Sequence, residues 1–299
     1  MLVATVPAYL DDRSLDQLAR ALGSWPPPGR LLIDARACKW ASPYGFCALL
    51  TLGQAMAEAG LEPPRFAVPD AEEVRTYWAR AGFFKYAAEY FALHGKVPRK
   101  QPDEPSDVLL PVTPIRGTDD VHAVVNTVAE SATRILTAEL GLEPKSTGRF
   151  TMTFSEACQN ITEHAGTGGW VAVHAYHWRR RLGRRVVVMA ISDAGVGFRR
   201  SLEATESRKF GDRWSDGTAL ETALIQEISR FRDPGRGQGL AMIKRTLREW
   251  QGKISIRSGT ARLAIVPPWD DDSPLTEHLP YFPGSQVQIV IPAREGHAP

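Results

Sequence analysis

Two long segments in the second half of the chain repeat apolar residues at helical spacing. In residues 119–140 one apolar stripe contains Val121, Val124, Val125, Val128, Ala132, Ile135 and Leu136. In residues 147–165 the stripe contains Phe150, Phe154, Ala157, Cys158 and Ile161. Apolar positions that recur three or four residues apart are typical of a helix that buries one face. The pattern predicts two consecutive amphipathic helices.

Runs of β-branched and apolar residues follow these two segments. Residues 170–178 and 184–192 predict a pair of strands, and Gly252 is suited to end a helix over 239–250. Three more strands are predicted, at 253–257, 262–266 and 286–291. The order of helices and strands predicts an α/β sandwich, with a mixed sheet covered by helices.

The first third of the chain alternates short apolar runs with helical patterns. Strands are predicted at 31–34 and 66–68, and helices at 45–59 and 72–81. This alternation favours a separate α/β layer. Five prolines lie within residues 98–118, which is typical of a linker. We therefore divide the chain into residues 1–98, a linker at 99–107, and residues 108–299, whose first piece at 108–115 is extended.

Composition narrows the class of protein without naming a ligand. The 299 residues are 43% hydrophobic and 23% charged, as in a globular protein, and the net charge of +2 gives no argument for nucleic acid or membrane. The N-terminus lacks a signal-peptide pattern, and Cys38, Cys47 and Cys158 lack metal spacing, so we expect reduced thiols in a cytoplasmic protein. Five arginines in 179–185 favour a solvated hairpin tip over a nucleic-acid contact.

Glu156 and Asn160 are candidate functional residues because they lie four apart in a predicted helix. At that spacing both side chains share one face, which here is opposite the apolar stripe. A carboxylate beside an amide oxygen suits a hydrated Mg²⁺ ion. The alternative is a pair of polar residues on a solvated helix face. His164 lies one turn further along, where it either joins the site or interacts with the end of the helix.

Asp193, Gly195 and Gly197 follow the predicted strand 184–192. An aspartate at the end of a buried strand can present its carboxylate to a cavity, and the glycines allow the backbone to approach a ligand closely. A strand followed by a common Asp-Gly turn is the simpler alternative.

The segment Gly235-Arg236-Gly237-Gln238-Gly239-Leu240 precedes a predicted helix. Glycine-rich entries to helices expose backbone N–H groups that hold phosphate oxygens, and Arg236 is long enough to reach a terminal phosphate. A glycine hinge is the alternative. The segment is neither a P-loop nor a Rossmann fingerprint, because it lacks Gly-Lys-Ser/Thr and does not follow a strand.

The ordered trio Glu156-x-x-x-Asn160, Asp193-x-Gly195-x-Gly197 and 235–240 resembles the nucleotide-binding boxes of the GHKL ATPases, which include gyrase, Hsp90, histidine kinases and MutL. The anti-sigma serine kinases are the most similar branch. The resemblance implies Glu156 as general base, Asn160 as Mg²⁺ ligand and Asp193 as acceptor for the adenine amino group. It also implies that His164 lines the phosphates, that 198–234, with a helix at 219–229, form a lid, and that Ser285 lies near the adenine. Gly195, Gly197, Gly237, Gly239 and Leu240 would complete the ATP site.

The segment LLIDARACKWASPYGFCALLTL at 31–52 resembles the middle of a STAS domain. In that fold an Asp-Ser-Ser-Gly turn carries a phosphoacceptor serine, whereas this chain has Ser42-Pro43-Tyr44-Gly45. The resemblance implies a regulatory or interaction domain over residues 1–98 and leaves Ser42 and Tyr44 as the positions to examine for phosphorylation.

The sequence therefore predicts a bacterial ATP-binding regulator with ATP and Mg²⁺ as cofactors. A protein kinase or ATPase of the anti-sigma type, acting on a protein partner or substrate, is the main hypothesis. A non-catalytic module that uses ATP to set a partner-binding conformation is the alternative. Membrane and nucleic-acid partners are not expected, and homodimerisation stays open.

Overall fold

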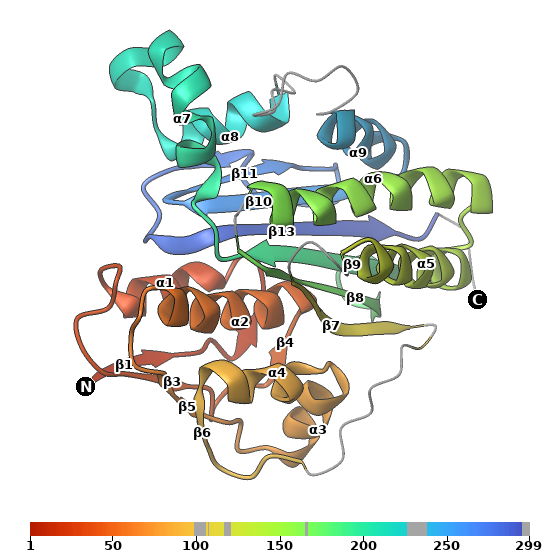
Figure 1. Ribbon diagram of the computed structural model, residues 1–299. Helices are drawn as coiled ribbons and strands as arrows, with labels where there is room; N and C mark the ends of the chain where they lie inside the picture. The colour runs from red at the N-terminus through yellow and green to blue at the C-terminus, as the bar shows by residue number, and fades with distance from the viewer. Residues whose placement is uncertain (99–105, 107, 117–120, 165–166, 226–237, 295–299) are drawn as a thin grey trace.

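A computed structural model gives the structure of the protein and describes residues 1–98, 106, 108–116, 121–164, 167–225 and 238–294. Figure 1 shows two main sheets. The smaller sheet is parallel, in the order β1–β3–β5–β6, with β1 (Leu2–Thr5), β3 (Leu31–Asp34), β5 (Arg65–Ala67) and β6 (Ala92–His94). A two-stranded piece pairs β2 (Tyr9–Leu10) with β4 (Trp40–Ala41). The helices of this region are α1 (Leu15–Leu22), α2 (Pro43–Glu58), α3 (Glu72–Arg80) and α4 (Phe83–Tyr90).

The larger sheet has the order β12–β11–β10–β13–β9–β8–β7. Its strands are β7 (Leu109–Ile115), β8 (Gly169–Trp178), β9 (Arg184–Asp193), β10 (Lys253–Gly259), β11 (Ala261–Ile265), β12 (Leu275–Thr276) and β13 (Phe282–Pro292). All the neighbouring pairs described are antiparallel, so the expectation of a mixed sheet is wrong. Two successive helices, α5 (Val121–Leu140) and α6 (Pro144–His164), connect β7 to β8. One crossover helix would leave β8 parallel to β7, whereas two reverse it.

The helices and strands expected in the second half are confirmed with small shifts at their ends. Helix α6 begins three residues before the expected 147, and α9 (Gln238–Glu249) begins one residue before 239. The helix expected at 219–229 is α8 (Asp216–Ile225), and residues 226–237 lie outside the described part. Helix α7 (Gly197–Phe210), followed by a 3₁₀ turn at Gly211–Arg213, was not predicted. Its only buried residues are Leu202 and Glu206, so it lacks an apolar stripe.

Helix α2 is the central layer between the two sheets. Its residues from Pro43 to Met56 are all buried, and one side packs on β8, β9 and β13 of the larger sheet. In Figure 1, α5, α6 and α9 cover the opposite face of that sheet. A helix that is apolar on all sides is expected to be buried on all sides. Ser42 begins the helix by accepting a hydrogen bond from Gly45 N at 3.1 Å, with proline at the next position.

The N-terminal region (residues 1–98) and the larger sheet therefore share one hydrophobic core. The core around α2 includes Trp170 and Ala172 of β8, Ala190 of β9 and Phe282 of β13. The division of the chain at residues 98 and 107 stays a prediction. Because the core is shared, a fragment ending at residue 98 would expose the side of α2 that packs on the larger sheet.

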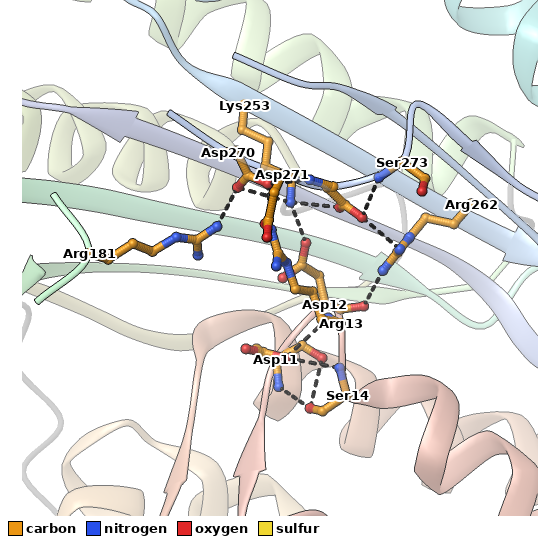
Figure 2. A network of polar contacts seen from close by, with 11 residues as sticks. Asp11, Asp12, Arg13, Ser14, Arg181, Lys253, Arg262, Asp270, Asp271 and Ser273 are labelled. Atoms are coloured by element: carbon orange, nitrogen blue, oxygen red, sulfur yellow. Dashed lines mark hydrogen bonds and ion pairs between the residues drawn. The ribbon is translucent and has the colours of Figure 1, made fainter. Parts of the chain in front are cut away.

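A buried cluster of charges joins the N-terminal region to the strand β10. Figure 2 shows Lys253 among carboxylates from both regions. Its Nζ lies 3.2 Å from Asp12 Oδ2, 3.4 Å from Asp270 Oδ2 and 2.7 Å from Asp272 Oδ2. Arg262 contacts Asp272 Oδ1 at 2.9 Å and donates to the Asp12 carbonyl at 3.0 Å. Burial opposes ionisation of Asp272, but Lys253 and Arg262 outweigh it and hold its pKa below the ordinary value.

Arg257 of β10 forms a second buried link to the N-terminal region. Its side chain is fully buried, and its guanidinium lies 3.0 Å from Asp16 Oδ1 on α1. It also donates to the carbonyl oxygens of Gly259 and Pro280. Burying charges is costly, and removing one partner of a buried pair is more costly still. These links therefore make the docking of the N-terminal region specific in position.

Replacement of Lys253 by methionine should destabilise the protein by about 3–5 kcal/mol, because Asp12, Asp270 and Asp272 lose their shared cation. Urea unfolding at neutral pH measures the loss. The difference from the parent should shrink on acidification, since the unpaired carboxylates can then take up protons.

Arg30→Met is the matched control. Arg30 pairs with Glu62, but the two side chains are 73% and 70% exposed. Exposed pairs contribute roughly 0–1 kcal/mol, so this change should be nearly neutral. Equal effects of the two methionine substitutions would contradict a structural role for the buried cluster.

Candidate functional site

Asp193 is the last residue of β9 and faces the layer of helices. Side chains alternate between the faces of a strand. Met189 and Ile191 pack in the core with α5 and α6, whereas the hydroxyl of Ser192 contacts Thr51 of α2 at 2.7 Å. Asp193 is therefore on the face of α6, opposite to the N-terminal region. The sequence predicted that Asp193 ends a buried strand, and this placement agrees with that prediction.

The carboxylate of Asp193 has an unusual environment. Burial raises the pKa of Asp193 to about 7. Backbone N–H groups of Gly195 and Ser285 oppose the increase, and Gly195 N donates to Oδ1 at 2.9 Å. The nearby Glu58 carboxylate adds a small further increase. Raised pKa values of this kind often mark functional sites.

A glycine allows β13 to approach Asp193 closely. Gly284 has φ +71°, and a Cβ atom there would lie 1.8 Å from the carbonyl oxygen of Asp193. No side chain fits at that distance. The residue after it, Ser285, is the direct cross-strand neighbour of Asp193. Ser285 therefore lies beside Asp193, and its expected position near the adenine stays a prediction.

The turn after Asp193 is tied to β10. Gly197 has φ +75°, and a Cβ atom there would lie 2.7 Å from Ser258 Oγ. The same oxygen accepts a hydrogen bond from Phe198 N at 3.1 Å, at the start of α7. The glycine expected for close backbone approach is thus needed for packing against the protein's own strand. This role is compatible with a ligand on the other side of the turn.

Glu156, Asn160 and His164 all lie in the second half of α6, which packs on β9. The structure does not describe their side chains, so their roles stay predictions. Five residues after His164 the chain reaches Gly169, which pairs with Asp193 across the sheet.

The third predicted box lies only partly within the described residues. Gly235, Arg236 and Gly237 lie outside them, as does the side chain of Leu240. The backbone of Gly239 and Leu240 is in the first turn of α9, which packs against α6. The first turn of a helix carries free backbone N–H groups that bind anions. The described part of α9 therefore lies next to the helix of Glu156 and Asn160, and phosphate binding at its start stays a prediction.

The described part of the expected lid consists of α7 and α8, and both are anchored. Asp216 Oδ2 accepts hydrogen bonds from Thr260 N at 2.9 Å and Thr260 Oγ1 at 2.7 Å. Leu202, Trp214, Ala219 and Ala223 form a small core between the two helices. Residues 226–234 of the expected lid lie outside the described part.

The remaining candidates have structural explanations. Arg181 contacts Asp270 and packs over Trp178 and Trp269, and Arg185 pairs with Glu139, which favours the turn interpretation of the arginine run. The three cysteines are buried and free, and burial raises their pKa values. Among the described residues, no cluster of three His, Cys, Asp or Glu side chains could hold a metal, and no helix is long and apolar enough to cross a membrane.

Gly284→Ala should destabilise the protein strongly, because its new methyl group would displace the backbone of β9 at Asp193. Thermal unfolding measures the effect. Gly183→Ala is a matched control, since Gly183 has φ +66° but no atom within 4 Å of the added Cβ. The control should cost only the left-handed backbone penalty of about 1–2 kcal/mol. A similar loss in both variants would show that close approach at Gly284 is unimportant.

The raised pKa of Asp193 predicts a pH-dependent stability. Between its ordinary value of 3.8 and about 7, the folded protein keeps a proton that the unfolded chain releases. Proton binding by Asp193 therefore stabilises the folded state at low pH, and this contribution is smallest at high pH. The unfolding free energy of the parent, relative to Asp193→Asn, should fall as pH rises from about 4 to 7 and then level off. Urea unfolding across this range tests the prediction, and a constant difference would contradict it.

Comparison with protein families gives a match to a part of the chain that is slightly shorter than half of it. Residues 119–262 match the histidine kinase-like ATPase domain. The match begins at α5 and ends in β11, so it contains α6, Asp193 and the start of α9. No curated protein matches the chain. Residues 119–262 are thus similar to a histidine kinase-like ATPase domain, and this similarity implies ATP binding.

Proposed function

We propose that the protein binds Mg-ATP between Asp193, the second half of α6 and the start of α9, and that it regulates another protein. The observation that best supports this proposal is the position of Asp193, which lies on the helix-covered face of β9 within the residues that match the ATPase domain. We thus assign the ATP binding implied by the family match to individual residues. We also propose a regulatory role of the anti-sigma type.

Asp193 would select adenine by accepting a hydrogen bond from its 6-amino group. Guanine carries a carbonyl oxygen at the same position, and above about pH 7, where Asp193 is ionised, this oxygen would face the carboxylate without a hydrogen between them. A site that requires a hydrogen bond discriminates strongly against a ligand that leaves its polar group unpaired. Ser285 and the turn through Gly195 and Gly197 would border the base.

The phosphates would lie at the start of α9, where the backbone of Gly239 and Leu240 belongs to the first turn. Free N–H groups at a helix start suit their negative charge. Arg236, Gly237 and His164 are proposed to complete this end. Asn160 would hold Mg²⁺, since an amide oxygen and phosphates are the ligands that this ion prefers. The ion, when bound, neutralises charge on the phosphates.

Glu156 would act as the general base, either on water or on a hydroxyl group of a protein substrate. The N-terminal region is proposed as a STAS-like regulatory unit and not as that substrate. Ser42 is 2% exposed and occupied as the cap of α2, and Tyr44 is 1% exposed. An acceptor hydroxyl must reach the phosphate, so we place it on a separate protein.

A non-catalytic ATP-gated module is the second candidate. The shared core around α2 favours it, because a nucleotide that shifts β9 would also bear on the N-terminal region. In this case ATP would set the conformation that a partner recognises, and Glu156 would have no role in turnover.

Two substitutions on α6 distinguish these functions. Glu156→Gln keeps the shape and hydrogen bonding but cannot accept a proton, so turnover should fall by about 10²–10⁴-fold while ATP binding remains. Asn160→Ala removes the Mg²⁺ ligand, so ATP affinity should lose its dependence on Mg²⁺. Calorimetry with and without Mg²⁺, beside phosphate release or transfer from labelled ATP, measures both effects.

The parent protein provides the reference for these variants. Turnover of Glu156→Gln at the parental rate would exclude Glu156 as the base. ATP binding by the parent without any turnover or transfer would favour the gated module. Absence of binding, or equal affinity for ATP and GTP, would contradict the proposed site itself.

A further inference from the structure

Helix α2 carries two buried polar residues at the place where it crosses the end of β8 and β9. Thr51 is 0% exposed and Gln54 is 6% exposed, in a helix whose other buried residues are mostly apolar. Buried polar side chains cost free energy unless they form hydrogen bonds. Both side chains form hydrogen bonds to residues adjacent to Asp193 or to its cross-strand neighbour, and Gln54 also donates to Glu58 of its own helix at 2.9 Å.

Thr51 holds the residue before Asp193. Its Oγ1 lies 2.7 Å from Ser192 Oγ, and both side chains are at most 1% exposed. Ser192 points to α2 and Asp193 points to α6, since consecutive side chains face opposite sides of the strand. The Thr51–Ser192 hydrogen bond therefore fixes, from behind the sheet, the backbone that directs the Asp193 carboxylate to the helix layer.

Gln54 holds both neighbours of Gly169, the residue paired with Asp193 on β8. Its Oε1 accepts a hydrogen bond from Trp170 Nε1 at 2.9 Å, and its Nε2 donates to the carbonyl oxygen of Gly168 at 3.0 Å. Gly168 also lies just before β8, on the connection from α6. The side-chain amide of Gln54 thus bonds to residues on both sides of Gly169, at the end of β8 next to Asp193.

We propose that Thr51 and Gln54 are positioning residues for adenine recognition, through which the N-terminal region sets the location of the Asp193 carboxylate. This inference rests on the proposed function. Errors of about 1 Å in a binding group can cost large factors in recognition. Because the coupling is reciprocal, a partner that shifts α2 would change adenine affinity, and bound adenine would in turn favour the docked position of α2.

The test uses an ATP analogue that lacks the amino group read by Asp193. Calorimetry compares ATP with purine riboside triphosphate on the full-length protein. In Thr51→Val, ATP affinity should fall roughly three- to tenfold, the scale of one lost neutral hydrogen bond. Affinity for the analogue should stay at the parental value, since this ligand does not use the carboxylate.

Two variants control for the packing of α2. Thr51→Ser keeps the hydroxyl group and should restore the parental preference for ATP over the analogue. Thr147→Val makes the same change at a fully buried threonine on α6, whose hydroxyl donates to the carbonyl oxygen of Glu143, just before the helix. It should leave the preference unchanged.

Ser192→Ala tests the same hydrogen bond from the sheet, including the case in which Thr51→Val does not fold. The double variant should lose no more preference for ATP than either single one, because both remove one interaction. Equal loss of affinity for both nucleotides, or no loss, would overturn the positioning role while leaving the ATP site intact. A parent without preference for ATP over the analogue would overturn the proposed adenine contact, and this inference with it.

Discussion

Each strand in the middle of the larger sheet has two faces that must be covered, and this requirement organises the molecule. Helices α5, α6 and α9 bury one face, with residues such as Phe150, Phe154 and Leu247 fully inaccessible. The other face is buried by α2, which belongs to the N-terminal region. The two regions are thus joined by a shared core, and the larger sheet, which contains most of the ATPase-like residues 119–262, is folded against the N-terminal region. Burial of each large apolar side chain contributes about 1.5–3 kcal/mol, so this contact is a major part of the stability.

Charge makes the contact specific. Lys253, Arg257 and Arg262 project from the larger sheet and are almost fully buried among carboxylates of the N-terminal region and of residues 270–272. Such pairs add little stability compared with apolar packing, but a misplaced docking would leave several charges unpaired. The same argument applies on a smaller scale to Thr51 and Gln54. Apolar contacts hold the two regions together, and polar contacts decide where β8 and β9 end relative to α2.

Sequence patterns predict the structural features that are determined by residues close together in the chain. Helices α5 and α6 were predictable because their apolar stripes are long, and the turn at Asp193 was predictable because an aspartate and two glycines follow a strongly apolar strand. Contacts between distant segments left weaker signals. In β10, Lys253 and Arg257 alternate with isoleucines, a pattern typical of a strand with one solvated face. The structure buries those cations because Asp12 and Asp16, about 240 residues earlier, lie beside them. Thr51 and Gln54, in an otherwise mostly apolar helix, are the signs in the sequence that α2 contacts polar groups of another segment.

In the proposed site adenine lies on one face of β9 and the N-terminal region on the other, and both contact the end of the same strand. Hydrogen–deuterium exchange with and without Mg-ATP tests this arrangement most directly, because backbone protection reports each segment separately. Compared with the nucleotide-free protein, we expect slower exchange with ATP at residues 193–197 and 284–286, at the start of α9, and in the second half of α2. GTP should not produce this protection. Protection confined to other segments, or equal protection by the two nucleotides, would contradict this arrangement.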